Sequence, residues 1–127
     1  QQSKGDFRVA SELPVAVIGG GETTVTLPKA NGTGGRNQEL ALVAAVALES
    51  LKLDNVVVAS IGTDGSDGAT DAAGGIVDRS DFGDGAVAAL TRHDAYPYLE
   101  KMDALVKTGP TGTNVADVIL AMIQRAK

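Results

Sequence analysis

Four glycine-rich loops carry most of the side chains in this sequence that could perform chemistry. Each loop combines glycine, which lets backbone approach a ligand closely, with the polar residues Thr, Asp, Asn or Arg. The loops span residues 19–24, 32–39, 62–75 and 108–114. Any one of them could be a simple turn, but four of one composition in 127 residues favour a single shared ligand site.

The second loop runs into the start of a predicted helix and indicates an anion site. Arg36 follows two glycines there and precedes Asn37 and Glu39. Free backbone N–H groups at a helix start, together with the helix dipole and a guanidinium, attract phosphate or carboxylate. Gly35, Asn37 and Glu39 are therefore candidates for substrate binding. The alternative is a structural Arg36–Glu39 pair, in which Glu39 orients Arg36 or helps to cap the helix.

The third loop is acidic and indicates a cation or phosphate site. Asp64, Asp67 and Asp71 lie within eight residues and repel one another unless a cation, an arginine or backbone N–H groups neutralise them. Oxygen ligands suit Mg²⁺, so Asp64 and Asp67 are candidate metal ligands, and Thr63 and Asp67 are candidate substrate contacts. The alternative is a set of Asx turns, in which each carboxylate binds its own backbone.

The first and last loops supply further candidate binding groups. Glu22 stands at the exit of a predicted strand, where a lone carboxylate is either functional or a solvated turn residue. The last loop offers hydroxyl and amide groups but no titratable side chain, so it could hold a ligand but not act as a base. The binding candidates in these two loops are Gly20, Gly21, Glu22, Thr23, Thr111, Thr113 and Asn114. His93, the only histidine, is expected to be solvated at a helix end.

Strands and helices must alternate along the chain to position these loops. Apolar residues at helical spacing over 36–51 predict a helix that is apolar nearly all round and therefore buried. Continuous apolar runs at 15–18 and 55–61 predict strands, and 117–123 fits either a strand or a short helix. Further strands are expected at 23–27, 76–77 and 104–107, and further helices at 85–92 and 97–102.

This alternation predicts a single-domain α/β fold, with a layered mixed sheet and flanking helices. The sheet is expected to be mixed because a short turn at 19–22 would join two neighbouring strands. Residues 1–13 are interpreted as a leader or interdomain linker, and residues 14–127 as the domain.

Composition excludes several classes of function. The 16 acidic residues outnumber the 11 basic ones, and a formal net charge of −5 argues against nucleic-acid or membrane partners. The absence of cysteine excludes disulfides, thiolate metal sites and cysteine nucleophiles, and it fits a cytoplasmic protein. No G-x-x-x-x-G-K-[ST] motif occurs, which excludes an autonomous P-loop nucleotidase.

Four motifs in this order resemble one known family. They are GGETTVT at 20–26, GGRNQELAL at 34–42, GTDG at 62–65 with TDAAG at 70–74, and TGPTGTNV at 108–115. Together they resemble the MOFRL domain, the C-terminal domain of the glycerate 2-kinases that also carry the name hydroxypyruvate reductase. The resemblance covers roughly residues 14–123, nearly the whole chain.

The resemblance implies transfer of the ATP γ-phosphoryl group to the 2-hydroxyl of D-glycerate, giving 2-phosphoglycerate. It implies an active site between this domain and an N-terminal nucleotide-binding domain of the same protein, which also supplies a catalytic lysine. Arg36 and Asp64 are then the catalytic candidates, with Glu22 lining the same cleft. Asp64 would act either as a general base or, with Asp67, as a ligand of Mg²⁺.

ATP and Mg²⁺ would belong to the full-length enzyme, and neither is expected to bind tightly to this domain alone. The isolated domain is expected to be inactive. One alternative is a hydroxypyruvate reductase domain, which the lack of a G-x-G-x-x-G fingerprint disfavours. Another is a non-catalytic ligand-binding or interface module.

Overall fold

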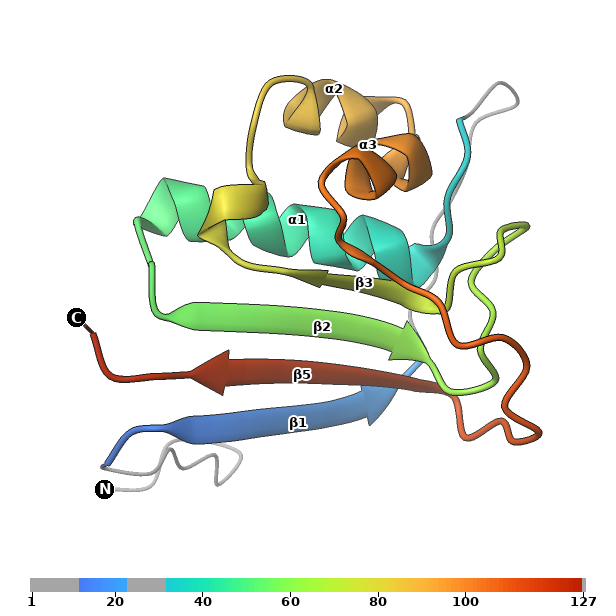
Figure 1. Ribbon diagram of the computed structural model, residues 1–127, viewed down its shortest axis with the longest axis horizontal. Coiled ribbons are helices and arrows are strands. Elements are labelled where there is room, and N and C mark those ends of the chain that lie inside the picture. The colour runs from blue at the N-terminus through green and yellow to red at the C-terminus, as the bar shows by residue number, and fades with distance from the viewer. Residues whose placement is uncertain (1–11, 23–31, 127) are drawn as a thin grey trace.

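Five strands and three α-helices make up the ordered elements of the computed structural model, which describes residues 12–22 and 32–126 (Figure 1). The strands are β1 (Val15–Gly21), β2 (Val56–Gly62), β3 (Gly74–Val77), β4 (Leu105–Val106) and β5 (Asp117–Ile123). The helices are α1 (Arg36–Leu51), α2 (Ala86–Thr91) and α3 (Ala95–Lys101), with a 3₁₀ turn, η2 (Arg79–Asp81), before α2. Most of the expected elements are therefore confirmed, while the predicted strand at 23–27 and most of the predicted leader lie outside the described residues.

The strands form one sheet in the order β1-β5-β2-β3-β4, which confirms the α/β fold. Every pairing among these strands is antiparallel, so the sheet differs from the mixed sheet expected. The physical reason is connectivity: the third loop returns the chain from β2 to β3 beside it, and β5 lies between β1 and β2 with the opposite direction to both. Gly21, Asp117 and Gly62 are consequently aligned at one end of three adjacent strands.

Pairing partners decide two further local features. Gly19–Gly21, expected to be a loop, continue β1 because they pair with the first three residues of β5. Residues 117–123 form a strand rather than a helix because they lie between β1 and β2 and pair with both. The predicted site residues Gly20 and Gly21 thus belong to a strand.

Helix α1 packs on β2 and β3, and α2 and α3 lie on the far side of α1 from the sheet (Figure 1). The residues of α1 that are buried among these elements include Ala41, Leu42, Ala45 and Leu48. Val43 and Leu51, by contrast, are exposed, so α1 is partly exposed rather than buried all round. The reason is that an apolar side chain is buried only where another element packs against it, and the described elements cover only part of the helix. None of the described helices is long and apolar enough to cross a membrane.

Candidate functional site

The guanidinium of Arg36, in the first turn of α1, is held by a carboxylate that the sequence motifs did not reveal. Arg36 Nε donates to Asp117 Oδ2 at 2.7 Å, and Nη2 donates to Asp117 Oδ1 at 3.0 Å. Glu22 Oε2 lies 3.5 Å from Nη2. The hydrogen bond to Asp117 raises the pKa of Arg36 above its ordinary value, helped by the charges of Asp117 and Glu22. Arg36 Nη1 makes no hydrogen bond to a described residue and is the atom left for a ligand.

The start of α1 is capped by Asp67 from the third loop. Asp67 Oδ1 accepts from the backbone N–H and the Nδ2 of Asn37, at 3.0 and 3.1 Å. Asp67 Oδ2 accepts from the backbone N–H and the Nε2 of Gln38, at 2.8 and 2.9 Å. The carboxylate of Asp67 therefore occupies the anion site expected at this helix start. It caps the helix from a distant loop, in the place where a ligand anion would otherwise bind.

The close approach of Asp67 requires glycine at position 35. Gly35 is the residue before α1, and its backbone is extended, so its conformation alone would suit any side chain. A Cβ at this position, however, would overlap the carboxyl group of Asp67. Gly35 therefore leaves the space that the Asp67 carboxyl group occupies, and its contact with a substrate stays a prediction.

Asp64 is half-buried in the third loop. Its Oδ1 accepts from the backbone N–H of Ser66 at 2.9 Å and from Ser66 Oγ at 3.2 Å, which confirms the Asx turn for this residue. No described residue donates a hydrogen bond to Asp64 Oδ2. One carboxylate oxygen is thus available to accept a proton or a ligand hydrogen bond.

The metal site expected at Asp64 and Asp67 does not fit this arrangement. Four N–H donors already surround the two oxygens of Asp67, and its side chain is buried. Asp64 alone keeps an open oxygen. Among residues 12–22 and 32–126, no three acidic or histidine side chains lie close enough to hold a metal ion. These residues do not build a Mg²⁺ site by themselves.

The fourth loop is tied to the third through Thr63. Thr63 Oγ1 donates to the backbone carbonyl of Ala116 at 2.7 Å and accepts from the backbone N–H of Val115 at 2.8 Å. Thr111 Oγ1 donates to the carbonyl of Thr63. Thr63 and Thr111 therefore fasten the two loops together. Thr113 and Asn114 are exposed in the same segment and remain candidates for ligand contact.

Glu39 and His93 form a pair that corrects two sequence expectations. His93 Nδ1 lies 2.7 Å from Glu39 Oε1, and the two side chains are only 23% and 18% exposed. His93 is therefore half-buried against α1 rather than solvated. Glu39 faces this histidine, so it is not the partner of Arg36; Asp117 takes that role because β5 brings it beside the helix start.

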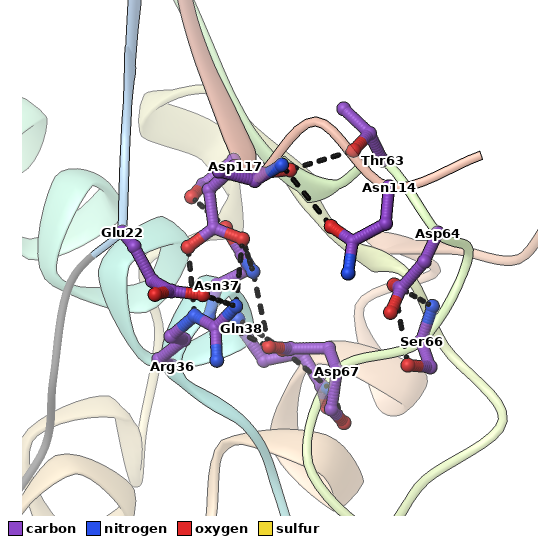
Figure 2. Close-up of polar contacts among 12 residues, drawn as sticks. Glu22, Arg36, Asn37, Gln38, Thr63, Asp64, Ser66, Asp67, Asn114 and Asp117 are labelled. Carbon is purple, nitrogen blue, oxygen red and sulfur yellow. Dashed lines mark hydrogen bonds and ion pairs between the residues drawn. The ribbon is translucent and has the colours of Figure 1, made fainter.

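Figure 2 shows how these groups gather at one end of the sheet. Glu22 comes from the end of β1, Arg36 from the start of α1, Asp64 from the third loop and Asn114 from the fourth, and Asp117 begins β5. The convergence expected from the four motifs is confirmed for the described residues. Thr23 lies outside them. The cluster also contains Asp67, and the charges of Asp117, Glu22 and Asp67 all act on the Arg36 guanidinium.

Sequence reasoning missed Asp117 because it lies outside the glycine-rich loops. The available signal was a single acidic residue at the start of an otherwise apolar run, VILAMI. The side chain is buried to 2% exposure and also accepts from Asn37 Nδ2 at 3.2 Å. A charge in such a position requires a partner, and Arg36 supplies it.

The chain belongs to the MOFRL family, and the match covers residues 15–117. D-glycerate 2-kinase of Thermotoga maritima is 53% identical over 116 residues, which cover 87% of this chain and 27% of that protein. Glycerate 2-kinase of Pyrococcus horikoshii is 42% identical over 118 residues, covering 88% of this chain and 26% of the relative. An Agrobacterium vitis protein provisionally named a hydroxypyruvate reductase is 40% identical over 117 residues, covering 87% and 30%.

Two solved structures share the fold. A glycerate kinase from Thermotoga maritima superposes with a TM-score of 0.80 at 53% identity, over 87% of this chain and 27% of that one. A protein from Pyrococcus horikoshii gives a TM-score of 0.82 at 41% identity, over 91% and 27%. The chain thus spans about a quarter of the length of these relatives.

Proposed function

We propose that this chain is the C-terminal domain of a glycerate 2-kinase and contributes half of an interdomain site. The reaction is ATP-dependent phosphorylation of D-glycerate to 2-phosphoglycerate. The other half, with the nucleotide-binding loops and a catalytic lysine, would come from the N-terminal domain of the same, longer polypeptide. We place this enzyme in the cytoplasm.

The observation that carries the proposal is the charge of the cluster at the sheet end. The charges of Glu22, Asp67 and Asp117 act on Arg36, and Asp64 adds a further carboxylate at the same sheet end, whereas ATP and glycerate are both anions. Such ligands need further cations nearby, because phosphoryl transfer relies on charge neutralisation and positioning. A half-site completed by another domain explains why one guanidinium is enough here, and the matched region makes up only 27% and 26% of the two kinase relatives.

Two side chains have direct roles in this proposal. Arg36, fixed by Asp117, presents Nη1 to the glycerate carboxylate or to the transferred phosphoryl group. Asp64 accepts the proton of the 2-hydroxyl through Oδ2 while the hydroxyl oxygen bonds to the γ-phosphorus and the bond to ADP breaks. ATP and Mg²⁺ would be bound chiefly by groups outside this chain.

The test is a coupled assay of ADP release with D-glycerate and ATP, applied to the longer polypeptide and to its Arg36→Lys variant. Lysine keeps the charge, but its ammonium group lacks the planar set of donors with which a guanidinium binds Asp117 and a ligand at once. We expect kcat to fall about tenfold or more, equivalent to about 1.4 kcal/mol. Wild-type kcat and KM in the variant would remove Arg36 from the site. The 127-residue chain alone should show no ATP- and glycerate-dependent turnover.

A second candidate is reduction of hydroxypyruvate, which the name of the Agrobacterium vitis relative favours. The same preparation should then oxidise NADH or NADPH when hydroxypyruvate is added. We expect no such oxidation, since no dinucleotide fingerprint occurs in this chain. Nicotinamide oxidation without ADP release would replace the kinase proposal with the reductase.

A further inference from the structure

The sheet face that points away from α1 is apolar in every strand that forms it. Ser60 marks the opposite face, because its Oγ donates to Asn37 of α1 at 2.8 Å. Side chains alternate along a strand, so the neighbouring Ala59 and Ile61 point away from the helix. Strand register extends this assignment to the even-numbered residues of β1, β3 and β5 and the odd-numbered residues of β2, which we call the open face.

The open face contains only Ala, Gly, Val, Ile, Leu and Met. One cross-strand row on it joins Ile18, Leu120, Ala59 and Ile76. Ile18 is 71% exposed, Ile76 44% and Met122 42%. Helices of the described residues pack on the other side of the sheet. In a strand with one face in water, polar residues point to the water and apolar residues to the core. A contiguous uncharged face of this kind therefore indicates an interface.

We infer that the open face is covered by an apolar helix layer from the part of the polypeptide outside this chain. The inference rests on the proposed function, which makes this chain one domain of a longer protein. Relatives hold about three quarters of their length outside the matched region, which is ample for such a layer. Sheets that are apolar on both faces are covered by helices on both.

The position of the open face also favours this occupant. Its end row contains Gly20 and Val118, which are adjacent in sequence to Gly21 and Asp117 of the candidate site. A segment that completes the site around Arg36 would therefore be able to continue directly onto the open face. Because the face carries no charge, its partner must present apolar side chains rather than a complementary charged surface.

Thiol labelling tests this directly, because the chain contains no cysteine. Ile18→Cys is placed in the longer polypeptide, with Val87→Cys on α2 as the matched control at 57% exposure. N-ethylmaleimide labelling is measured in buffer and in urea, and each site is read from its own peptide by mass spectrometry. We expect native Ile18→Cys to label at least about tenfold more slowly than in urea, and Val87→Cys to label at nearly the same rate in both.

Three results would overturn or support the inference independently of catalysis. Fast native labelling at position 18 would overturn it, even if the polypeptide phosphorylates glycerate. Protection that disappears on dilution would also overturn it, because the cover would then be a second copy. Protection at every dilution supports it, even if no kinase activity is found. Met122→Cys, on the same face, repeats the test should Ile18→Cys fail to fold.

Discussion

At the scale of single residues, the Asp117–Arg36 pair defines the candidate site. Asp117 is a buried carboxylate that binds Arg36 through both of its oxygens, while Arg36 remains 37% exposed at its side chain. The buried partner fixes the guanidinium plane through Nε and Nη2. Asp117 is therefore a positioning residue, and its effect on any ligand passes through Arg36.

Asp117→Asn should destabilise the fold measurably. An amide group keeps the shape of the carboxylate but loses its charge. Its NH₂ group would also face an N–H donor of Arg36, and two donors repel each other. Hydrogen bonds to charged groups contribute about 1.5–3 kcal/mol, so we expect the free energy of unfolding to fall by about 2 kcal/mol. Urea denaturation followed by circular dichroism measures it.

Asp54→Asn is the matched control for this change. Asp54 is also paired with an arginine, Arg79, but its side chain is 80% exposed. Exposed pairs contribute little, so its loss should stay within about 0.5 kcal/mol. Equal losses for the two variants would show that burial does not strengthen the Asp117 pair.

At the scale of elements, the start of α1 depends on a distant loop. Gly35 provides no side-chain cap, and Asp67, about 30 positions along the chain, binds the second and third N–H groups of the helix. One contact thus fixes the helix start, the third loop and, through Asn37, the position of Asp117.

Gly35→Ala should break this arrangement, while Gly34→Ala should not. The Cβ at position 35 would overlap the Asp67 carboxyl, and overpacking of this kind costs about 1–3 kcal/mol. The Cβ at position 34 meets the nearest atom of Ala95 at 3.4 Å, an ordinary contact. We expect a change within about 0.5 kcal/mol there. A smaller loss for Gly35→Ala than for Gly34→Ala in thermal unfolding would contradict the capping role of Asp67.

At the scale of the whole molecule, ion pairs link α1 to the segment after β3. Arg79 Nε donates to Glu49 Oε1 at 3.0 Å, and its Nη1 binds Asp54. The hydrogen bond from Arg79 holds the pKa of Glu49 below its usual 4.5. The unfolded chain therefore binds this proton more readily than the folded one, and the stabilisation is lost as pH falls from about 4.5 through the lower folded value.

Arg79→Gln should flatten the acid limb of the stability curve. Without the guanidinium, Glu49 loses the largest cause of its lowered pKa, although Lys52 still lowers it, so the urea midpoint should change less between pH 5 and pH 3 than in the wild type. Arg92→Gln removes the same charge from an arginine outside the ion pairs of the described residues. It should keep the wild-type slope, and an identical slope in both variants would exclude the Glu49 contribution.

The sequence by itself determined the elements and the convergence of the motifs. Periodicity over 36–51 located α1 to the residue, since a long helical pattern is a local property. The glycine-rich motifs located the loops around Arg36 and Asp64 because backbone approach and turn formation select glycine locally.

Only the tertiary structure decided strand direction and the partners of the charges. Antiparallel pairing joins residues 13 to 108 positions apart, and the contacts of Asp67 and Asp117 with the start of α1 join residues 29 to 81 positions apart. Local patterns carry no information on which of several carboxylates reaches a given donor. The sequence therefore makes Asp67 a candidate metal ligand and leaves Glu39 as one possible partner of Arg36, and only the placement of β5 and the third loop gives both side chains their actual partners.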